Sequence, residues 1–224
     1  MTNLPLKVEI INNFLKELSG RAYLEIGVRN GQNFFSIECS HKYGVDPEFF
    51  FAKRFLLKSL LKPKNWFYKM FKSTSDDFFK NNIKYNFIKQ KVGVIFIDGL
   101  HTYEQSLKDA INSLKLIDNK GLIIFHDCNP ISEIAGSPTN PNREISWNGD
   151  VWKTIYHLRK YTDQLDCHTV NTDEGLGVLK WKCGPNIDFL SEIKICDHIK
   201  NLPYSFLEKN RNTSLGLQNS IESS

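Results

Sequence analysis

The sequence lacks the features that would mark a membrane-spanning, secreted or disulfide-rich protein. In its 224 residues no apolar run approaches the roughly 20 residues of a membrane span, and no basic segment followed by an apolar one indicates a signal peptide. The five cysteines are scattered, odd in number and without C-x-x-C spacing, so neither a disulfide framework nor a structural zinc site is indicated. We therefore expect a cytoplasmic protein in a reducing environment.

The chain also lacks a strong charge of one sign. Its formal net charge of +4 is too small to indicate a nucleic-acid partner. The hydrophobic share of 41% and the charged share of 24% are ordinary for a globular protein, and the length suits one domain that buries a full core. We expect no nucleic-acid partner, and the sequence leaves the oligomeric state open.

One glycine pattern is missing and another stands in its place. Residues 23–31 read Tyr-Leu-Glu-Ile-Gly-Val-Arg-Asn-Gly, a short buried strand followed by a tight turn between Gly27 and Gly31, and residues 32–39 have the apolar spacing of a helix. This is not the G-x-G-x-x-G that holds a pyrophosphate. The carboxylate of Glu25 would repel a diphosphate, whereas it suits a ligand with an amino group and a sulfonium. The turn therefore favours S-adenosylmethionine over NAD.

The rest of the chain alternates apolar strands with amphipathic helices, which is typical of βαβ units in a parallel sheet. Strands are expected over residues 22–26, 42–45, 65–71, 92–97 and 122–125, and helices over 6–18, 48–62, 103–117 and 151–161. Residues 165–170 and 176–181 are two extended runs joined by a short turn, so they should pair antiparallel. The pattern predicts an α/β fold whose mostly parallel sheet ends in an antiparallel hairpin.

Two segments do not follow this alternation. Residues 128–149 hold three prolines and two glycines without any period, and such long loops are usually functional lids or disordered, so we expect a mobile lid over the acceptor pocket. Beyond Pro185 the pattern weakens, and residues 207–224 are expected to be a frayed tail.

Several motifs in this order resemble the class I S-adenosylmethionine-dependent methyltransferases, in particular the branch found among bacterial sugar and macrolide O-methyltransferases. The resemblance spans about residues 20–182. Its segments are Leu-Glu-Ile-Gly-Val-Arg-Asn-Gly (24–31), Gly-Val-Asp-Pro (44–47), Ser-Thr-Ser-Asp-Asp-Phe (73–78), Phe-Ile-Asp-Gly-Leu-His-Thr-Tyr (96–103), Gly-Leu-Ile-Ile-Phe-His-Asp (121–127), Gly-Asp-Val-Trp-Lys (149–153) and Gly-Leu-Gly-Val (175–178).

The resemblance implies a Rossmann-like, seven-stranded, mostly parallel sheet with a terminal antiparallel hairpin and helices on both faces. A methyltransferase domain is expected over residues 1–184, beginning with an N-terminal helix within residues 1–20, and residues 185–224 would form a C-terminal extension. The implied activity is S-adenosylmethionine-dependent methylation of a hydroxyl on a sugar, glycan or other small molecule.

The cofactor site is expected beyond the carboxyl ends of the strands. Glu25, Gly27 and Gly31 would face the methionine part of the cofactor, and Asp46 would accept hydrogen bonds from the ribose hydroxyls. By resemblance, three further residues complete the site: Ser75 and Asp76 beside the adenine, unless they only cap a helix, and Asp98 after the fourth strand.

The same edge carries the candidate catalytic residues Asp98, His101, His126 and Asp127. A sugar hydroxyl must lose its proton to a base, or a metal must lower its pKa. In related metal-dependent enzymes carboxylates after the fourth and fifth strands hold magnesium, and Asp98 and Asp127 match that pattern. His126 stands where a carboxylate is usual, and magnesium prefers oxygen ligands. The sequence therefore leaves two alternatives open, a magnesium ion or a histidine base.

The acceptor is not identified by the sequence. A basic and aromatic stretch, residues 49–72, would dock an acidic acceptor such as a nucleotide-linked or lipid-linked sugar, or is simply a solvated amphipathic helix followed by a strand. Trp147 and Trp152 are candidates for stacking on a sugar ring. Two other classes of protein stay open as alternatives: a nucleotide-binding oxidoreductase and a non-catalytic cofactor-binding scaffold.

Overall fold

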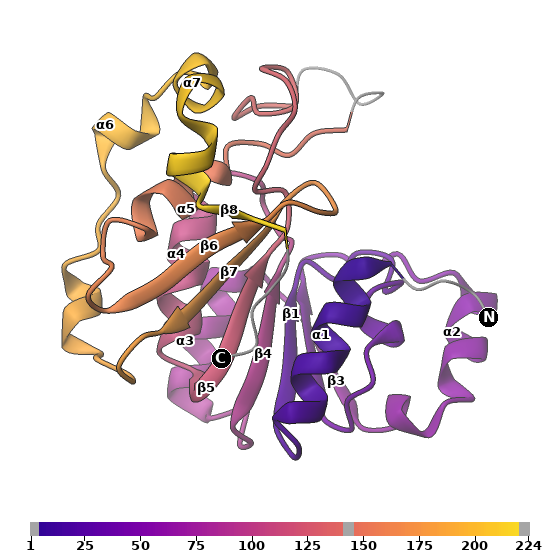
Figure 1. The fold of residues 1–224 in the computed structure, drawn as a ribbon. Coiled ribbons are helices and arrows are strands. Elements are labelled where there is room, and N and C mark those ends of the chain that lie inside the picture. The colour runs from indigo at the N-terminus through magenta and orange to yellow at the C-terminus, as the bar shows by residue number, and fades with distance from the viewer. Residues whose placement is uncertain (1–4, 141–145, 220–224) are drawn as a thin grey trace. The chain divides into compact units, whose positions relative to one another are not determined.

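The chain folds into two compact units. In this computed structural model the described residues are 5–140 and 146–219. One unit consists of residues up to Gly99 together with Leu116–Leu122, and the other of Leu100–Lys115 together with the residues from Ile123 onward. Figure 1 shows the helices and strands of both. This division leaves the expected boundary between residues 184 and 185 as a prediction.

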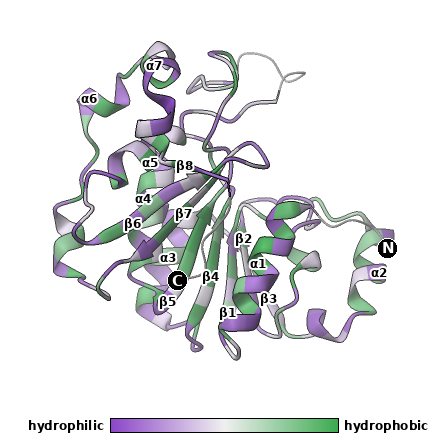
Figure 2. Cartoon of the chain, in the orientation of Figure 1, coloured by the Kyte–Doolittle hydropathy of each residue, from purple (hydrophilic) through white to green (hydrophobic). Residues whose placement is uncertain are grey.

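The first unit is built on parallel strands with buried side chains. β1 (Ala22–Ile26) pairs in parallel with β2 (Lys42–Asp46) on one side and β4 (Val92–Ile97) on the other, and β2 pairs in parallel with β3 (Tyr68–Lys72). Every residue of β1, β2 and β4 is buried. Runs buried on both faces are what parallel strands require, and β1 and β4 are largely hydrophobic in Figure 2.

The helices of the first unit are α1 (Leu6–Glu17), α2 (Lys53–Leu60) and α3 (Ser75–Tyr85), and two 3₁₀ turns are η1 (Phe34–Ser36) and η2 (Pro63–Asn65). The expected helix over residues 32–39 is wrong, because only η1 forms there. The buried ammonium of Lys42 explains this difference. Its Nζ donates to the carbonyl oxygens of Phe34 and Ile37, each at 3.1 Å, so these oxygens are held by a side chain instead of by a continuing helix.

The second unit contains the predicted hairpin. β6 (Leu165–Val170) and β7 (Leu176–Trp181) pair antiparallel over their full length, and β7 also pairs antiparallel with the end of β5 (Ile117–Phe125). Two helices, α4 (Tyr103–Leu114) and α5 (Trp152–Leu158), belong to this unit and bury the greater part of their residues. The antiparallel end of the sheet, expected from the short turn alone, is confirmed.

The C-terminal segment is ordered structure, and the expectation of a frayed tail from residue 207 is wrong for the residues described. It forms η3 (Asp188–Ser191), α6 (Asp197–Lys200), α7 (Tyr204–Leu215) and β8 (Leu217–Gln218). Leu207 and Leu215 are fully buried, and β8 pairs in parallel with β6. The helical backbone of α7 is broken at Asn210, so its buried residues do not follow one continuous helical period, and the sequence gives no clear signal there.

The eight strands have the order β3-β2-β1-β4-β5-β7-β6-β8. The Rossmann-like fold class is confirmed, with the two-residue β8 added to the seven strands expected. None of the described helices has the length and apolar character needed to cross a membrane.

Candidate active site

In the turn after β1 the backbone of Gly27 lies so close to other backbone atoms that a side chain does not fit. Gly27 has a φ of +90°, and a Cβ there would lie 1.9 Å from the backbone oxygen of Asp98. Arg29 and Gly31 also have positive φ, at +48° and +75°. The N–H of Gly27 donates to Val45 O, so the turn is fixed to the end of β2. The predicted turn is therefore present, and it packs against the backbone of Asp98, the residue that follows β4.

Glu25 faces the interior of the first unit. Its side chain is almost fully buried, and it accepts hydrogen bonds from the Tyr23 hydroxyl at 2.6 Å and from Asn33 Nδ2 at 2.9 Å. Burial, with a smaller contribution from the charge of Asp98, raises the pKa of Glu25 to about 8, and it outweighs the two hydrogen bonds, which lower the pKa. Tyr23 and Asn33 had not been identified from the sequence, since hydrogen-bonding partners of a buried acid leave no spacing signal. The expected contact of Glu25 with the cofactor stays a prediction.

Asp46 ends β2, as predicted, and holds the glycine turn. Its Oδ2 accepts the N–H of Arg29 at 2.8 Å, and its Oδ1 accepts the N–H of Glu48 at 2.8 Å. The two bonds fix the orientation of the carboxylate at the edge of the sheet beside the turn. Each carboxylate oxygen can accept a further hydrogen bond, so the arrangement is suited to a pair of neighbouring hydroxyls.

Ser75 and Asp76 lie in the first turn of α3, which follows β3. The N-cap of this helix is Thr74, whose Oγ1 accepts the N–H of Asp77 at 3.2 Å. The alternative that Ser75 and Asp76 serve as the cap is therefore wrong. Ser75 is half-buried and Asp76 is exposed. Their expected contact with an adenine stays a prediction.

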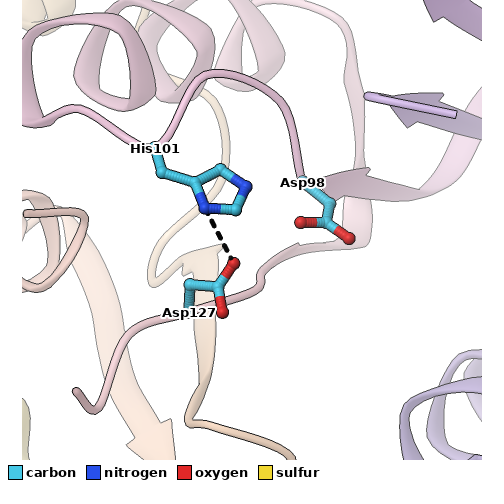
Figure 3. Close-up of side chains that lie close together, drawn as sticks. All are labelled: Asp98, His101 and Asp127. Atoms are coloured by element: carbon cyan, nitrogen blue, oxygen red, sulfur yellow. Dashed lines mark ion pairs between the residues drawn. The ribbon is translucent and has the colours of Figure 1, made fainter. Parts of the chain in front are cut away.

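The second unit brings His101, His126 and Asp127 together. Both histidines direct Nδ1 at the same carboxylate oxygen, Asp127 Oδ2, at 3.2 Å from His101 and 3.1 Å from His126. Figure 3 shows the ion pair between His101 and Asp127; Asp98, also drawn there, belongs to the first unit. Three of the four predicted catalytic residues therefore form one cluster within the second unit.

Asp127 is a buried carboxylate that is kept ionised. Burial by itself would raise the pKa, but hydrogen bonding and charge from His126, the charge of His101 and a hydrogen bond from Asn148 together lower it below its usual value. Asn148 Nδ2 lies 2.7 Å from Asp127 Oδ1. The backbone of Asp127 has a φ of +63°, an uncommon value for a residue other than glycine. Such strain at a polar cluster is typical of functional sites.

The hairpin turn before β7 supplies a second carboxylate to His126. Its Nε2 lies 3.6 Å from Asp173 Oδ2, so both ring nitrogens of His126 face carboxylates. Asp173, Glu174 and Gly175 are three consecutive residues with positive φ, and a Cβ at Gly175 would lie 2.4 Å from the backbone nitrogen of Asn129. Asp173, Glu174 and Asn148 had not been identified as site residues. The polar turn 171–175 was the signal that could have indicated the first two.

His101 is held by the segment just before α5. Its Nδ1 lies 3.1 Å from the backbone oxygen of Trp147, and its ring stacks on the Trp147 indole with centroids 5.2 Å apart. The His101 carbonyl accepts the N–H of Asp150, and a Cβ at Gly149 would lie 1.7 Å from that carbonyl oxygen. Asp150 Oδ1 in turn accepts the first N–H of α4, from Tyr103, at 2.7 Å. The Gly-Asp of the 149–153 motif therefore positions His101.

The two tryptophans proposed for sugar stacking have other neighbours. Trp152 is almost fully buried and stacks on Phe206, so its expected role as an acceptor platform is wrong. Trp147 is half-buried against His101 and donates from Nε1 to Ser137 O. The lid expected over residues 128–149 stays a prediction, and residues 141–145 of it lie outside the described residues.

The second unit's side chains do not fit a magnesium ion well. Both oxygens of Asp127 already accept from N–H groups, and the neighbouring residue 126 offers an imidazole nitrogen where magnesium prefers oxygen. The expected joint action of Asp98 and Asp127 on a metal stays a prediction.

Comparison with known proteins agrees with this fold. Residues 24–128 match the family model described as a methyltransferase domain. The SAH-bound methyltransferase PaMTH1 of Podospora anserina is similar in structure, with a TM-score of 0.57, 14% identity and coverage of 81% of this chain and 80% of that one. An O-methyltransferase of Bacillus cereus in complex with SAH has a TM-score of 0.52, 12% identity and coverage of 80% and 82%.

A third similar structure is the O-methyltransferase TomG of Streptomyces achromogenes, involved in tomaymycin synthesis and in complex with SAM, with a TM-score of 0.55, 11% identity and coverage of 78% and 79%. No curated protein matches the sequence. At these identities the structures establish the shared fold. The resemblance to methyltransferases that the sequence predicts is confirmed by the family match over residues 24–128 and by this fold.

Proposed function

We propose that this protein is an S-adenosylmethionine-dependent O-methyltransferase that acts on a hydroxyl of a sugar, glycan or other small molecule. Binding of S-adenosylmethionine is supported by the strained turn from Gly27 to Gly31, beside which Asp46 is fixed by its bond to Arg29 N. Similar proteins in complex with SAM or SAH support the same cofactor. When bound, S-adenosylmethionine would supply an electrophilic methyl group.

The cofactor residues are proposed as the sequence predicts them. Asp46 would accept hydrogen bonds from the ribose hydroxyls, because both of its oxygens are oriented by backbone N–H groups. Glu25, the glycine turn and Asp98 would face the methionine part. The half-buried Ser75 and exposed Asp76, in the first turn of α3, would contact the adenine.

The observation that carries the proposed chemistry is the pairing of His101 with Asp127. A carbonyl and a carboxylate both only accept hydrogen bonds, and both lie next to Nδ1 of His101. Nδ1 must therefore carry the proton, which leaves the lone pair of the neutral imidazole on Nε2. A base oriented in this way by a buried carboxylate is the arrangement used to deprotonate a hydroxyl.

The same geometry separates the two histidines. His126 faces a carboxylate with each nitrogen, so it donates to both only when it is doubly protonated, and in that form it has no lone pair for catalysis. We therefore assign the base to Nε2 of His101 and a supporting role to His126. The base would take the proton of the acceptor hydroxyl, and Asp127 would stabilise the imidazolium that forms.

The test is the pH dependence of SAH release in the purified protein, measured with a panel of sugar nucleotides, glycans and phenols. The rate should rise with pH through a histidine-like titration. His101→Gln should lose this titration and most of the rate, whereas the exposed His198→Gln, in α6, should behave as wild type.

Two further arms make the proposal refutable. A chelator such as EDTA should leave the rate unchanged; loss of turnover with retained cofactor binding would instead support magnesium. Calorimetry with S-adenosylmethionine and NAD side by side tests the cofactor, and binding of NAD alone would favour the oxidoreductase alternative. Binding of S-adenosylmethionine without turnover on any member of the panel would favour the scaffold.

A further inference from the structure

The segment from Phe49 to Ser75 has an unusual charge pattern. It contains no acidic residue, while its seven basic residues are Lys53, Arg54, Lys58, Lys62, Lys64, Lys69 and Lys72. Lys64 pairs with the half-exposed Glu38 at 3.4 Å. Among the described residues, no carboxylate lies within ion-pair distance of the other six. The segment therefore presents an almost uncompensated positive charge.

The same segment exposes large apolar side chains. Leu57 is 70% exposed, Leu61 79%, Trp66 62% and Phe67 68%. In α2 only Ser59 is buried, and Phe55 turns inward to make an edge-to-face contact with Phe35. Leu57 and Leu61 are four residues apart and lie on one side of the helix, away from that contact. Figure 2 shows both hydrophobic and hydrophilic colours along α2.

This combination defines a basic apolar surface, made of α2, η2 and the start of β3. We propose that it docks the protein on an anionic lipid surface. Aliphatic and aromatic side chains with lysines around them are the features of segments that lie in the headgroup region, where the lysines meet anionic lipids and the apolar groups insert. Trp66 donates from Nε1 to Leu60 O, which fixes the indole next to the end of the helix.

A pocket beside this surface has the same character. It has a volume of about 280 Å³ and lies at the amino ends of β2 and β3, opposite the edge that carries the glycine turn. Trp66, Phe67 and Lys69 line it together with His41 and Lys89, and no carboxylate does. A pocket with cationic and aromatic walls suits the phosphate of a lipid headgroup.

Two other occupants fit less well. A second copy of this chain would bring two uncompensated positive surfaces together, which is unfavourable. Single-stranded RNA is bound through aromatic platforms and a positive groove, and the two exposed leucines have no role in such binding. The lipid surface explains both the charge and the exposed aliphatic residues, and it does not depend on the proposed function.

The experiment is co-sedimentation of the full chain with vesicles of phosphatidylcholine that contain phosphatidylglycerol, and with vesicles of phosphatidylcholine alone. Binding should require the anionic lipid and should weaken at high salt. Leu57→Ser with Leu61→Ser, and separately Lys53→Gln, Arg54→Gln and Lys58→Gln together, should each weaken binding about tenfold or more. These residues are exposed, so circular dichroism should confirm that the variants fold.

Matched controls remove similar groups elsewhere in the first unit. Ile83→Ser removes another exposed apolar side chain, and Lys80→Gln, Lys84→Gln and Lys120→Gln together remove three exposed charges. These variants should bind vesicles as wild type does. Equal binding to both kinds of vesicle, or normal binding of the leucine variant, would overturn the proposal. Two other results would also overturn it. One is a dimer, seen by light scattering, that dissociates only in the leucine variant, and the other is binding of RNA in place of lipid.

Discussion

Two buried carboxyl groups, one in each unit, have opposite protonation behaviour. Glu25 is 1% exposed and its pKa is raised to about 8, whereas Asp127 is 4% exposed and its pKa is lowered. Burial is nearly the same, so it does not explain the difference. Glu25 is held by the uncharged Tyr23 and Asn33, while Asp127 faces two histidines that can carry a proton. The partner groups decide whether a buried acid stays charged.

The difference in protonation also suggests different roles for Glu25 and Asp127. A neutral carboxyl beside the glycine turn adds no negative charge to a ligand site, and it serves to hold Asn33 in place. An ionised carboxylate between two histidines would fix the tautomer of His101 and stabilise a positive charge that forms there. The first is expected to matter for stability and the second for turnover.

The largest effect should come from Asp127→Asn. An amide at this position cannot stabilise an imidazolium and can impose the wrong tautomer on His101, so kcat should fall about a thousandfold. Calorimetry should find S-adenosylmethionine binding nearly unchanged. If Glu25→Gln reduced kcat as strongly as Asp127→Asn, the division of tasks between the two acids would be wrong.

Gly27→Ala should be next. The added Cβ would meet the Asp98 backbone at 1.9 Å in a conformation with a φ of +90°. We expect the free energy of unfolding to fall by about 3 kcal/mol or more, measured by urea denaturation. Gly20→Ala is a matched control, since its φ is +81° and nothing lies within 4 Å of the added Cβ. That variant should lose only about 1 kcal/mol, and equal losses would contradict the steric explanation.

Asp46→Ala should weaken S-adenosylmethionine binding about tenfold or more, because it would remove the proposed hydrogen bonds to the ribose and does remove the bond to Arg29 N. Calorimetry measures the change in Kd. The exposed Asp163→Ala is the control and should bind normally. Unchanged affinity in Asp46→Ala would refute the ribose assignment.

The smallest effect is expected for Glu25→Gln, and it is a change in pH dependence. The ordinary pKa of 4.5 applies to the unfolded chain and about 8 to the folded one, so between these values the folded state holds a proton that the unfolded state has lost. Stability should therefore fall as pH rises from 4.5 to 8. Urea denaturation of Glu25→Gln at pH 5 and pH 8 should show a smaller fall than wild type, with Glu48→Gln unchanged from wild type.

The sequence alone predicted β1 to β7 and the helices α1, α2, α4 and α5 in their order along the chain, because buried strands and amphipathic helices leave clear periodic patterns. The runs at residues 92–97, 165–170 and 176–181 coincide with β4, β6 and β7. The turn at Gly27 and Gly31 was equally readable, since positive φ and close backbone approach require glycine.

Other features were decided only by the tertiary structure. Only the 3₁₀ turn η1 forms within residues 32–39, because the ammonium of Lys42, which lies outside the apolar pattern of that segment, donates to its carbonyl oxygens. Asn148, Asp173 and Glu174 joined the histidine cluster through a loop and a hairpin turn whose polar residues have no period. The opposite protonation of Glu25 and Asp127 depends on which side chains surround each carboxyl group, and residue order along the chain does not specify those neighbours.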